Sequence, residues 1–221
     1  MARPSLAAAR LYGILDTGYV DASTDAWERT CQALLAGGVD LLQLRAKRES
    51  HTVRRALLAR ILPLVQPTGV PLFINDDLEL ALREPALGLH VGQDDLPVAE
   101  ARAALGPDRL LGLSTHSPSQ AAGALAQADL LDYFAVGPVF ATATKPTYEP
   151  VGLELVSHVA GRRPALPWFC IGGLKTHNWP QVAAAGGVRA VVVSELLPPP
   201  KCRPGSSSSR NPNVAPASFQ P

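Results

Sequence analysis

The sequence has few cysteines, almost no net charge and no long apolar run. Its 221 residues include three cysteines, Cys31, Cys170 and Cys202, and carry a formal net charge of +1 at pH 7. Three scattered cysteines without CxxC or metal-ligand spacing argue against a disulfide framework, and Cys170 in an apolar run is expected to be a small buried hydrophobe. The near-neutral charge gives no electrostatic preference for nucleic acid or for membranes.

Targeting signals and several common catalytic motifs are also lacking. The N-terminal segment MARPSLAAARLYGILD lacks the apolar core and cleavage site of a signal peptide. No apolar run approaches the ~20 residues that a membrane span needs. A cytoplasmic protein with reduced thiols is therefore expected. The sequence contains no Walker loop, no catalytic triad pattern and no zinc-ligand spacing.

What the sequence does contain is a series of short apolar runs, each followed by polar or small residues. The runs are LYGILD (11–16), DLLQLR (40–45), PLFIND (71–76), GLHVG (88–92), LLGLS (110–114), YFAVG (133–137), WFCIGG (168–173) and AVVVSE (190–195). Helix-like apolar spacing between most of them predicts βαβ units and a parallel sheet. Eight such units are typical of an α/β fold, the (β/α)8 TIM barrel, whose active site forms at the carboxyl ends of the strands.

Helices are expected between these strands, and one connection is unusually long. The helical ranges are near 24–36 with Ser23 or Thr24 as cap, 50–65, 78–82, 97–106, from Ser117-Pro118 onward, and 177–185. The connection over 137–152 is a loop of a length that is usually functional. We expect residues 138–150 of this loop to be a lid that is mobile when empty and ordered by ligands.

The C-terminal end differs in composition from the rest. Residues 1–198 are predicted to form the barrel domain, and residues 199–221, rich in proline and serine, a disordered tail. The eighth helix of a complete barrel is thus missing from the sequence. Outward side chains of the eighth strand are then expected to meet water, which would leave the chain poorly soluble or marginally stable.

Acidic residues follow two neighbouring strands. Asn75 and Asp76 end the third strand, and Asp95 follows the fourth, so these groups can converge. Two carboxylates at adjacent strand ends suit Mg²⁺, which takes oxygen ligands and shares them with substrate phosphates. The alternative is that these acids cap the following helices.

Polar residues alternate along the second strand. Gln43, Arg45 and Lys47 are spaced to point the same way, toward the barrel mouth. A guanidinium and an ammonium group suit a polyanion such as diphosphate. The alternative is that Arg45 pairs with a carboxylate of the core.

Two further groups could bind a phosphate. Thr142, Thr144 and Lys145 make a plausible clamp in the long loop, although such residues are ordinary in loops. Gly172-Gly173 and Val193-Ser194 end the last two strands, where barrels often bind phosphate, although glycine is also common in turns. His90 and His116 flank the same mouth and are expected to be neutral structural residues rather than metal ligands.

Taken together, these motifs resemble those of the thiamine-phosphate synthase family over about residues 11–196. The matching segments, in the order and at the spacing of the family, are QLRAK (43–47), FIND (73–76), LHVGQDD (89–95), GLSTH (112–116), VGPVFATATK (136–145), IGG (171–173) and VVVS (191–194). The resemblance implies a barrel enzyme that joins an aminopyrimidine methyl diphosphate to a thiazole phosphate, or its carboxylated form, giving thiamine phosphate and diphosphate.

The resemblance also implies roles for individual residues. Asp76 and Asp95 would hold Mg²⁺, and Arg45, Lys47, Ser114 and Lys145 would be catalytic. Substrate binding would involve Gln43, Leu44, Arg45, Ala46, Lys47, Asn75, Ser114, Thr142, Ala143, Thr144, Lys145, Gly173, Val193 and Ser194. The partners implied are the two small-molecule substrates, with a homo-oligomer possible.

Two alternatives remain open. The related thiazole tautomerases share this barrel but typically lack the full metal and diphosphate set, and they usually have histidine where this chain has Pro138. The other alternative is a catalytically impaired copy that binds phosphate ligands, with a frameshifted or wrongly predicted C-terminus after Leu197. The complete set of charged residues and Pro138 favour the synthase.

Overall fold

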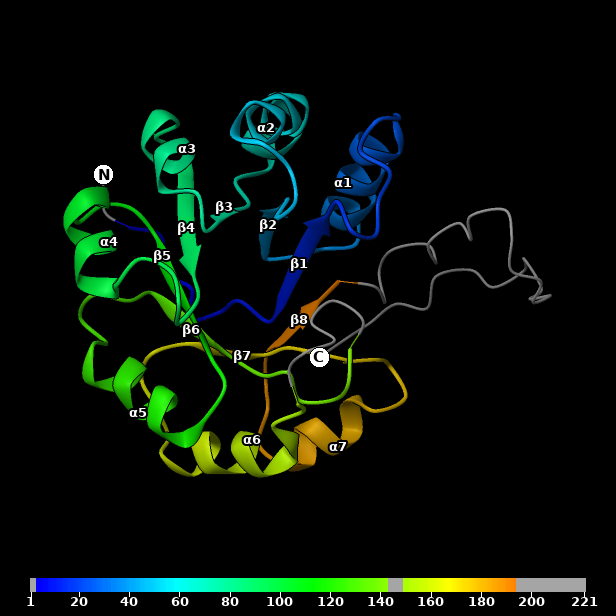
Figure 1. Cartoon of the computed structure of the whole chain (residues 1–221). Helices are drawn as coiled ribbons and strands as arrows, with labels where there is room; N and C mark the ends of the chain where they lie inside the picture. Colours follow the sequence, from blue (N-terminus) through cyan, green and yellow to red (C-terminus); the bar gives the residue numbers. More distant parts are fainter. Residues whose placement is uncertain (1–2, 143–148, 194–221) are drawn as a thin grey trace.

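Eight parallel strands close into a barrel in the computed structural model, which describes residues 3–142 and 149–193 (Figure 1). The strands are β1 (Leu11–Asp16), β2 (Leu41–Arg45), β3 (Leu72–Asn75), β4 (Leu87–Val91), β5 (Leu111–Thr115), β6 (Tyr133–Val136), β7 (Trp168–Cys170) and β8 (Ala190–Val192). Each strand pairs with the next, and β8 pairs with β1 to close the ring. The predicted eight-stranded barrel is confirmed.

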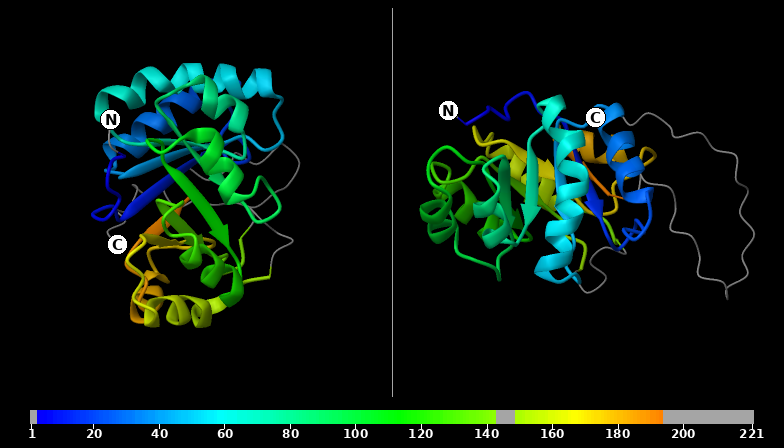
Figure 2. Two further views of the ribbon diagram at one scale, coloured as in Figure 1. Left: turned by 90° about the vertical axis from the view of Figure 1, so that its left-hand side faces the viewer. Right: turned by 90° about the horizontal axis from the view of Figure 1, so that it is seen from above.

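Helices run along the outside of the strands (Figures 1 and 2). The described residues contain α1 (Ala26–Ala36), α2 (His51–Val65), the short 3-10 helix η1 (Gln66–Thr68), α3 (Leu78–Arg83), α4 (Val98–Leu105), α5 (Pro118–Ala126), α6 (Gly152–Gly161) and α7 (Trp179–Ala184). Within residues 3–142 and 149–193, no helix is long and apolar enough to span a bilayer.

The helix starts were predicted well but not perfectly. The Ser117 hydroxyl caps α5 by accepting a hydrogen bond from the Gln120 N–H at 3.1 Å, as expected. The start of α1 was placed too early, because Asp25 rather than Ser23 or Thr24 is its N-cap residue. Helix α4 begins one residue after Pro97. Such one- or two-residue differences are usual at helix ends.

Side chains of the strands alternate between two cores. Leu42 and Leu44 of β2 pack in the large core that strands and helices share, whereas Gln43 between them points into the barrel. Tyr12 and Ile14 of β1 likewise belong to the inner core. Both faces of the strands are therefore buried, which explains why the apolar runs of the sequence are almost continuous.

Aromatic rings fill the inside of the barrel. Tyr12, Phe73, Tyr133 and Phe169 are buried there, and neighbouring ring centroids lie 5.3 to 5.9 Å apart. Tilted and edge-on contacts at these distances are favourable for aromatic side chains. The centre of the barrel is thus a packed core that forms a floor beneath the strand ends.

Gly112 makes room for one of these rings. A Cβ atom added at Gly112 would lie 2.2 Å from Cζ of Tyr133. We expect Gly112→Ala to lower the free energy of unfolding by about 1–3 kcal/mol through overpacking, as measured by urea denaturation. Gly123→Ala is the matched control, because a Cβ there meets nothing within 4 Å and alanine favours its helix, α5. Equal stability of the two variants would contradict this interpretation of Gly112.

Among residues 3–142 and 149–193, no helix lies between α7 and α1 beside β8 (Figure 1). The predicted absence of an eighth helix concerns residues that lie outside this described part of the chain. The prediction that outward side chains of β8 meet water is wrong for Ala190 and Val192, which are 0% and 1% exposed. These two small side chains share the outer core with Trp27 of α1 and Val182 of α7. The predicted tail, residues 199–221, lies outside the described residues.

Candidate active site

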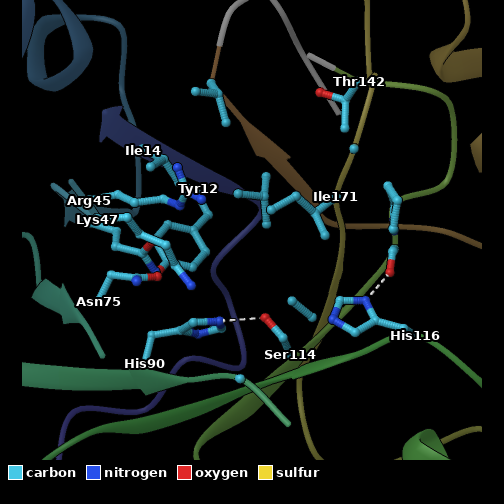
Figure 3. Close-up of a pocket in the computed structure, with 18 of the residues that line it drawn as sticks. Tyr12, Ile14, Arg45, Lys47, Asn75, His90, Ser114, His116, Thr142 and Ile171 are labelled. Carbon is cyan, nitrogen blue, oxygen red and sulfur yellow. Dashed lines mark hydrogen bonds between the residues drawn. The ribbon is translucent and has the colours of Figure 1, made fainter. Parts of the chain in front are cut away.

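A pocket opens at the carboxyl ends of the strands, where the sequence predicted the site (Figure 3). The predicted site residues that line it are Gln43, Arg45, Lys47, Asn75, Asp76, Asp95, Ser114, Thr142, Gly173 and Val193. In Figure 3, Arg45, Lys47 and Asn75 lie together on one side, and Thr142 and Ile171 lie on the other. The predicted charged groups that the structure describes therefore converge on one cavity.

Some of the predicted substrate-binding residues do not line this pocket. The side chains of Leu44 and Ala46 are buried in the outer core, because alternate residues of an extended segment point to opposite sides. Ala143, Thr144 and Lys145 lie outside the described residues, as does Ser194.

The carboxylates of Asp76 and Asp95 lie side by side. Asp76 Oδ2 is 2.9 Å from Lys47 Nζ and accepts a hydrogen bond from Asn75 Nδ2 at 2.5 Å. Asp95 Oδ2 accepts from the Gly92 N–H at 2.8 Å. The pKa of Asp95 is raised, first by burial and then by the hydrogen bond and like charge of Asp76.

Neither acid serves as a helix cap, so that alternative is wrong. Helix α3 is capped by Asp77, whose Oδ1 accepts from the Leu80 N–H at 2.9 Å. The N-cap residue of α4 is Pro97. Asp76 also has a φ of 60°, a conformation that is uncommon for residues other than glycine and is often found at functional sites. Asp76 and Asp95 are thus available to the pocket.

The donor set fits Mg²⁺. The adjacent carboxylates of Asp76 and Asp95, with Lys47 close by, form an oxygen-rich site. A bound cation would reduce the repulsion between the two carboxylates. Among residues 3–142 and 149–193, no group of three or more His, Cys, Asp or Glu side chains could hold a metal ion alone. Two protein carboxylates completed by substrate phosphate oxygens are a usual arrangement for this ion.

Arg45 lines the pocket and also pairs with a core carboxylate. Its Nη1 lies 2.5 Å from Asp16 Oδ2, and the Asp16 side chain is only 3% exposed. The predicted alternative, a pair with a core carboxylate, is therefore confirmed, and Arg45 also lines the pocket. Asp16 is a polar residue at the carboxyl end of β1. Polar residues at strand ends identified the predicted site residues of β2, β3 and β5, and the same criterion could have identified Asp16.

Two tyrosines inside the barrel carried no such signal. Tyr12 and Tyr133 hydrogen-bond to each other at 2.8 Å within the barrel, and in the sequence they look like ordinary apolar strand residues. His90 joins them: its Nδ1 is 2.7 Å from the Tyr133 hydroxyl, and its Nε2 is 2.8 Å from Ser114 Oγ. Both ring nitrogens of His90 are occupied, consistent with the expected structural role.

The loops after β6 and β7 pack closely at the opposite side of the pocket. A Cβ added at Gly172 would lie 2.4 Å from Cα of Pro138, and one at Gly173 would lie 2.7 Å from the Ala141 carbonyl oxygen. Both glycines have positive φ, at 97° and 63°. His116 Nδ1 donates a hydrogen bond to the Gly137 carbonyl oxygen in the same region (Figure 3). A side chain at either position would collide with the loop after β6, so glycine is required here for packing, independently of any ligand.

Relatives in sequence cover most of the chain. The family profile described as thiamine monophosphate synthase matches residues 11–196. A thiamine-phosphate synthase of Mycobacterium sp. (strain KMS) is 42% identical over 202 residues, 87% of this chain and 87% of that protein. One of Deinococcus radiodurans is 43% identical over 187 residues, 82% of this chain and 66% of that protein. One of Synechococcus sp. (strain CC9311) is 46% identical over 172 residues, 75% of this chain but 46% of that protein.

Solved structures share the fold. A thiamine phosphate pyrophosphorylase from Pyrococcus furiosus superimposes with a TM-score of 0.71 at 24% identity, over 85% of this chain and 86% of that one. A nitroalkane oxidase from Streptomyces ansochromogenes gives a TM-score of 0.61 at 17% identity, over 86% and 66%. The barrel fold thus occurs in proteins with different activities, and the fold alone does not identify the reaction. With the profile match over 11–196 and relatives above 40% identity, the chain belongs to the thiamine-phosphate synthase family.

Proposed function

We propose that this chain is a thiamine-phosphate synthase that uses Mg²⁺. It would join an aminopyrimidine methyl diphosphate to a thiazole phosphate, giving thiamine phosphate and diphosphate. The observation that carries the proposal is the meeting, in one pocket, of two adjacent carboxylates with two cations, Arg45 and Lys47. A site for a metal diphosphate needs both kinds of group, because the anion binds the cationic side chains and shares the metal with the acids.

The diphosphate would bind on the side of the pocket formed by β2, β3 and β4. Arg45 is held in place by Asp16, so its guanidinium loses little conformational freedom on binding. The ammonium group of Lys47, which pairs with Asp76 in this structure, would contact the diphosphate instead once a metal neutralises the Asp76 carboxylate. Asn75 would donate hydrogen bonds from its amide, which now contacts Asp76.

Asp76 and Asp95 would hold the Mg²⁺. When bound, the ion would neutralise charge that develops on the leaving diphosphate. The two carboxylates would be its protein ligands, and diphosphate oxygens would complete the set.

The thiazole phosphate would bind on the opposite side. Thr142, Gly173 and Val193 line the pocket and would form this subsite. Thr144 and Ser194, which lie outside the described residues, are proposed to complete this subsite. Two anion subsites on opposite walls would direct the reactive ends of both substrates toward the space between them.

The chemistry needs no protein nucleophile. The bond between the pyrimidine methylene carbon and the diphosphate oxygen breaks, and its electron pair leaves with the diphosphate. The thiazole nitrogen then supplies the electron pair of the new carbon–nitrogen bond. Arg45, Lys47 and Lys145 would stabilise the leaving group, and Ser114 would contact the pyrimidine or its diphosphate. The protein would act by positioning and electrostatic stabilisation.

The direct test is to incubate the purified chain with Mg²⁺ and both substrates. We expect thiamine phosphate and diphosphate in equal amounts, measured by mass spectrometry and a coupled diphosphate assay. A second reaction with the carboxylated thiazole phosphate alone tests the tautomerase alternative. Isomerisation there without thiamine phosphate in the first reaction would contradict the proposal, and binding of both substrates without any product would indicate an impaired copy.

We further propose that the enzyme acts in the cytoplasm. Cys31 and Cys170 are both buried with free thiols, and burial raises the pKa of each thiol to about 12. Such groups are small hydrophobes rather than redox or metal sites. Assembly into a homo-oligomer stays a prediction.

A further inference from the structure

Five polar side chains from five strands form one continuous hydrogen-bonded chain inside the barrel. Gln43 Nε2 is 2.7 Å from the Tyr12 hydroxyl, and the Tyr12 and Tyr133 hydroxyls are 2.8 Å apart. Tyr133 then contacts His90 Nδ1 at 2.7 Å, and His90 Nε2 contacts Ser114 Oγ at 2.8 Å. The last contact is drawn in Figure 3. The chain begins and ends on residues that line the pocket.

The three central side chains of this hydrogen-bonded series are almost fully buried, although Tyr12 and His90 also line the pocket. Tyr12, Tyr133 and His90 are 1%, 0% and 6% exposed, so each hydroxyl and ring nitrogen depends on its neighbours in the chain. The His90 ring also stacks on Tyr133, with centroids 5.6 Å apart and planes inclined by 24°. Burial raises the pKa of both tyrosines, so their hydroxyls keep their protons at neutral pH.

The order of donors and acceptors follows from the amide at one end. Gln43 Nε2 can only donate, so the Tyr12 oxygen accepts from it and Tyr12 donates its single hydrogen to Tyr133. Tyr133 in turn donates to His90 Nδ1. A neutral imidazole that accepts at Nδ1 carries its proton on Nε2, and this proton is donated to Ser114 Oγ.

We propose that Tyr12, Tyr133 and His90 are positioning residues that make Ser114 a hydrogen-bond donor toward the pocket. Ser114 Oγ accepts from His90, so its own hydrogen is directed to a ligand acceptor, either an oxygen or a ring nitrogen. The hydroxyl is thereby set as a donor before substrate binds, which reduces the cost of ordering it. The identity of the ligand acceptor rests on the proposed function, whereas the donor-to-acceptor direction of the hydrogen bonds from Gln43 to Ser114 does not.

The tautomer of His90 tests the direction without any ligand. The full chain, labelled with ¹⁵N-histidine, would be studied by two-bond ¹H–¹⁵N correlation at about pH 8, above the usual pKa of histidine. His90→Gln identifies the His90 signals among the five histidines. We expect the proton of His90 on Nε2 alone. A proton on Nδ1, or on both nitrogens, would overturn the proposal, because Tyr133 could then not be the donor.

Tyr133→Phe tests whether the chain positions Ser114. This variant keeps the ring and removes the hydroxyl, so His90 Nδ1 loses its donor and we expect a mixture of His90 tautomers. We also expect kcat to fall about tenfold, the effect of one hydrogen bond, while KM for thiazole phosphate is unchanged. An unchanged tautomer with unchanged kcat would contradict the positioning role.

Thr115→Val is the matched control. Thr115 follows Ser114 on β5, is fully buried, and donates its hydroxyl hydrogen to the Ala135 carbonyl oxygen at 2.9 Å, outside the chain of five side chains. We expect this variant to lose stability but to keep the His90 tautomer and kcat. If the wild type makes no thiamine phosphate while His90 carries its proton on Nε2, the proposed function fails and the hydrogen-bond direction stands. An active enzyme with the His90 proton on Nδ1 would instead support the function and overturn the direction.

Discussion

Asp76→Asn and Asp95→Asn are each expected to reduce kcat/KM for thiamine phosphate formation by about a hundredfold or more, the usual loss when a main electrostatic contributor is removed. An amide oxygen is a weaker ligand for Mg²⁺ than a carboxylate, and the two acids, which we propose as the metal ligands, are the carboxylates that line the pocket among the described residues. The same reaction is expected to stop in EDTA and to resume when excess Mg²⁺ is added.

Two controls distinguish the loss of a metal ligand from a general loss of folded structure. Asp94→Asn changes the neighbouring exposed acid, which is not part of the pocket lining, and is expected to leave kcat/KM unchanged. Asp95→Asn is expected to keep or raise the melting temperature at neutral pH. The folded-state pKa of Asp95 is raised, so its ionised form destabilises the fold above that pKa, and removing the charge relieves this repulsion. Full turnover in EDTA would exclude Mg²⁺ from the reaction.

Arg45→Ala is expected to weaken pyrimidine diphosphate binding by about a hundredfold, since a positioned guanidinium contributes a bidentate, charge-assisted contact. Thiazole phosphate, which we propose to bind at the opposite wall, should retain nearly its full affinity. Isothermal titration of each substrate separately measures the two effects. The reverse pattern would show that the two anion subsites are exchanged.

The same substitution also removes the partner of a buried carboxylate. Asp16 would be left unpaired, at a cost of about 3–5 kcal/mol in the free energy of unfolding. Asp16→Asn combined with Arg45→Ala is therefore expected to recover most of the stability but none of the diphosphate affinity. Recovery of binding in the double variant would mean that Arg45 acts only by holding the fold together.

The strand pattern was visible in the sequence for a physical reason. Parallel barrel strands are buried on both faces, so each appears as a short apolar run, and polar residues at its end mark the barrel mouth. Gln43, Arg45, Asp76 and Asp95 were found in this way, and all four line the pocket.

Other parts of the site depend on three-dimensional contacts that the sequence does not display. Tyr12 and Tyr133 are separated by 121 positions and meet only when the barrel closes. Their hydroxyls do not alter the apolar pattern of β1 and β6, so nothing distinguished them from core residues. The burial of Ala190 and Val192 depends on the three-dimensional packing of the shared outer core, which the apolar pattern of the sequence does not display, and it was therefore mispredicted.

The most direct measurement is a crystal structure of the chain with Mg²⁺, diphosphate and thiamine phosphate bound. We predict that the metal contacts Asp76 and Asp95 and that the diphosphate contacts Arg45 and Lys47. The phosphate of thiamine phosphate should lie at the opposite wall, beside Gly173. A diphosphate bound at Gly173, or a metal bound away from both aspartates, would contradict this assignment of the pocket.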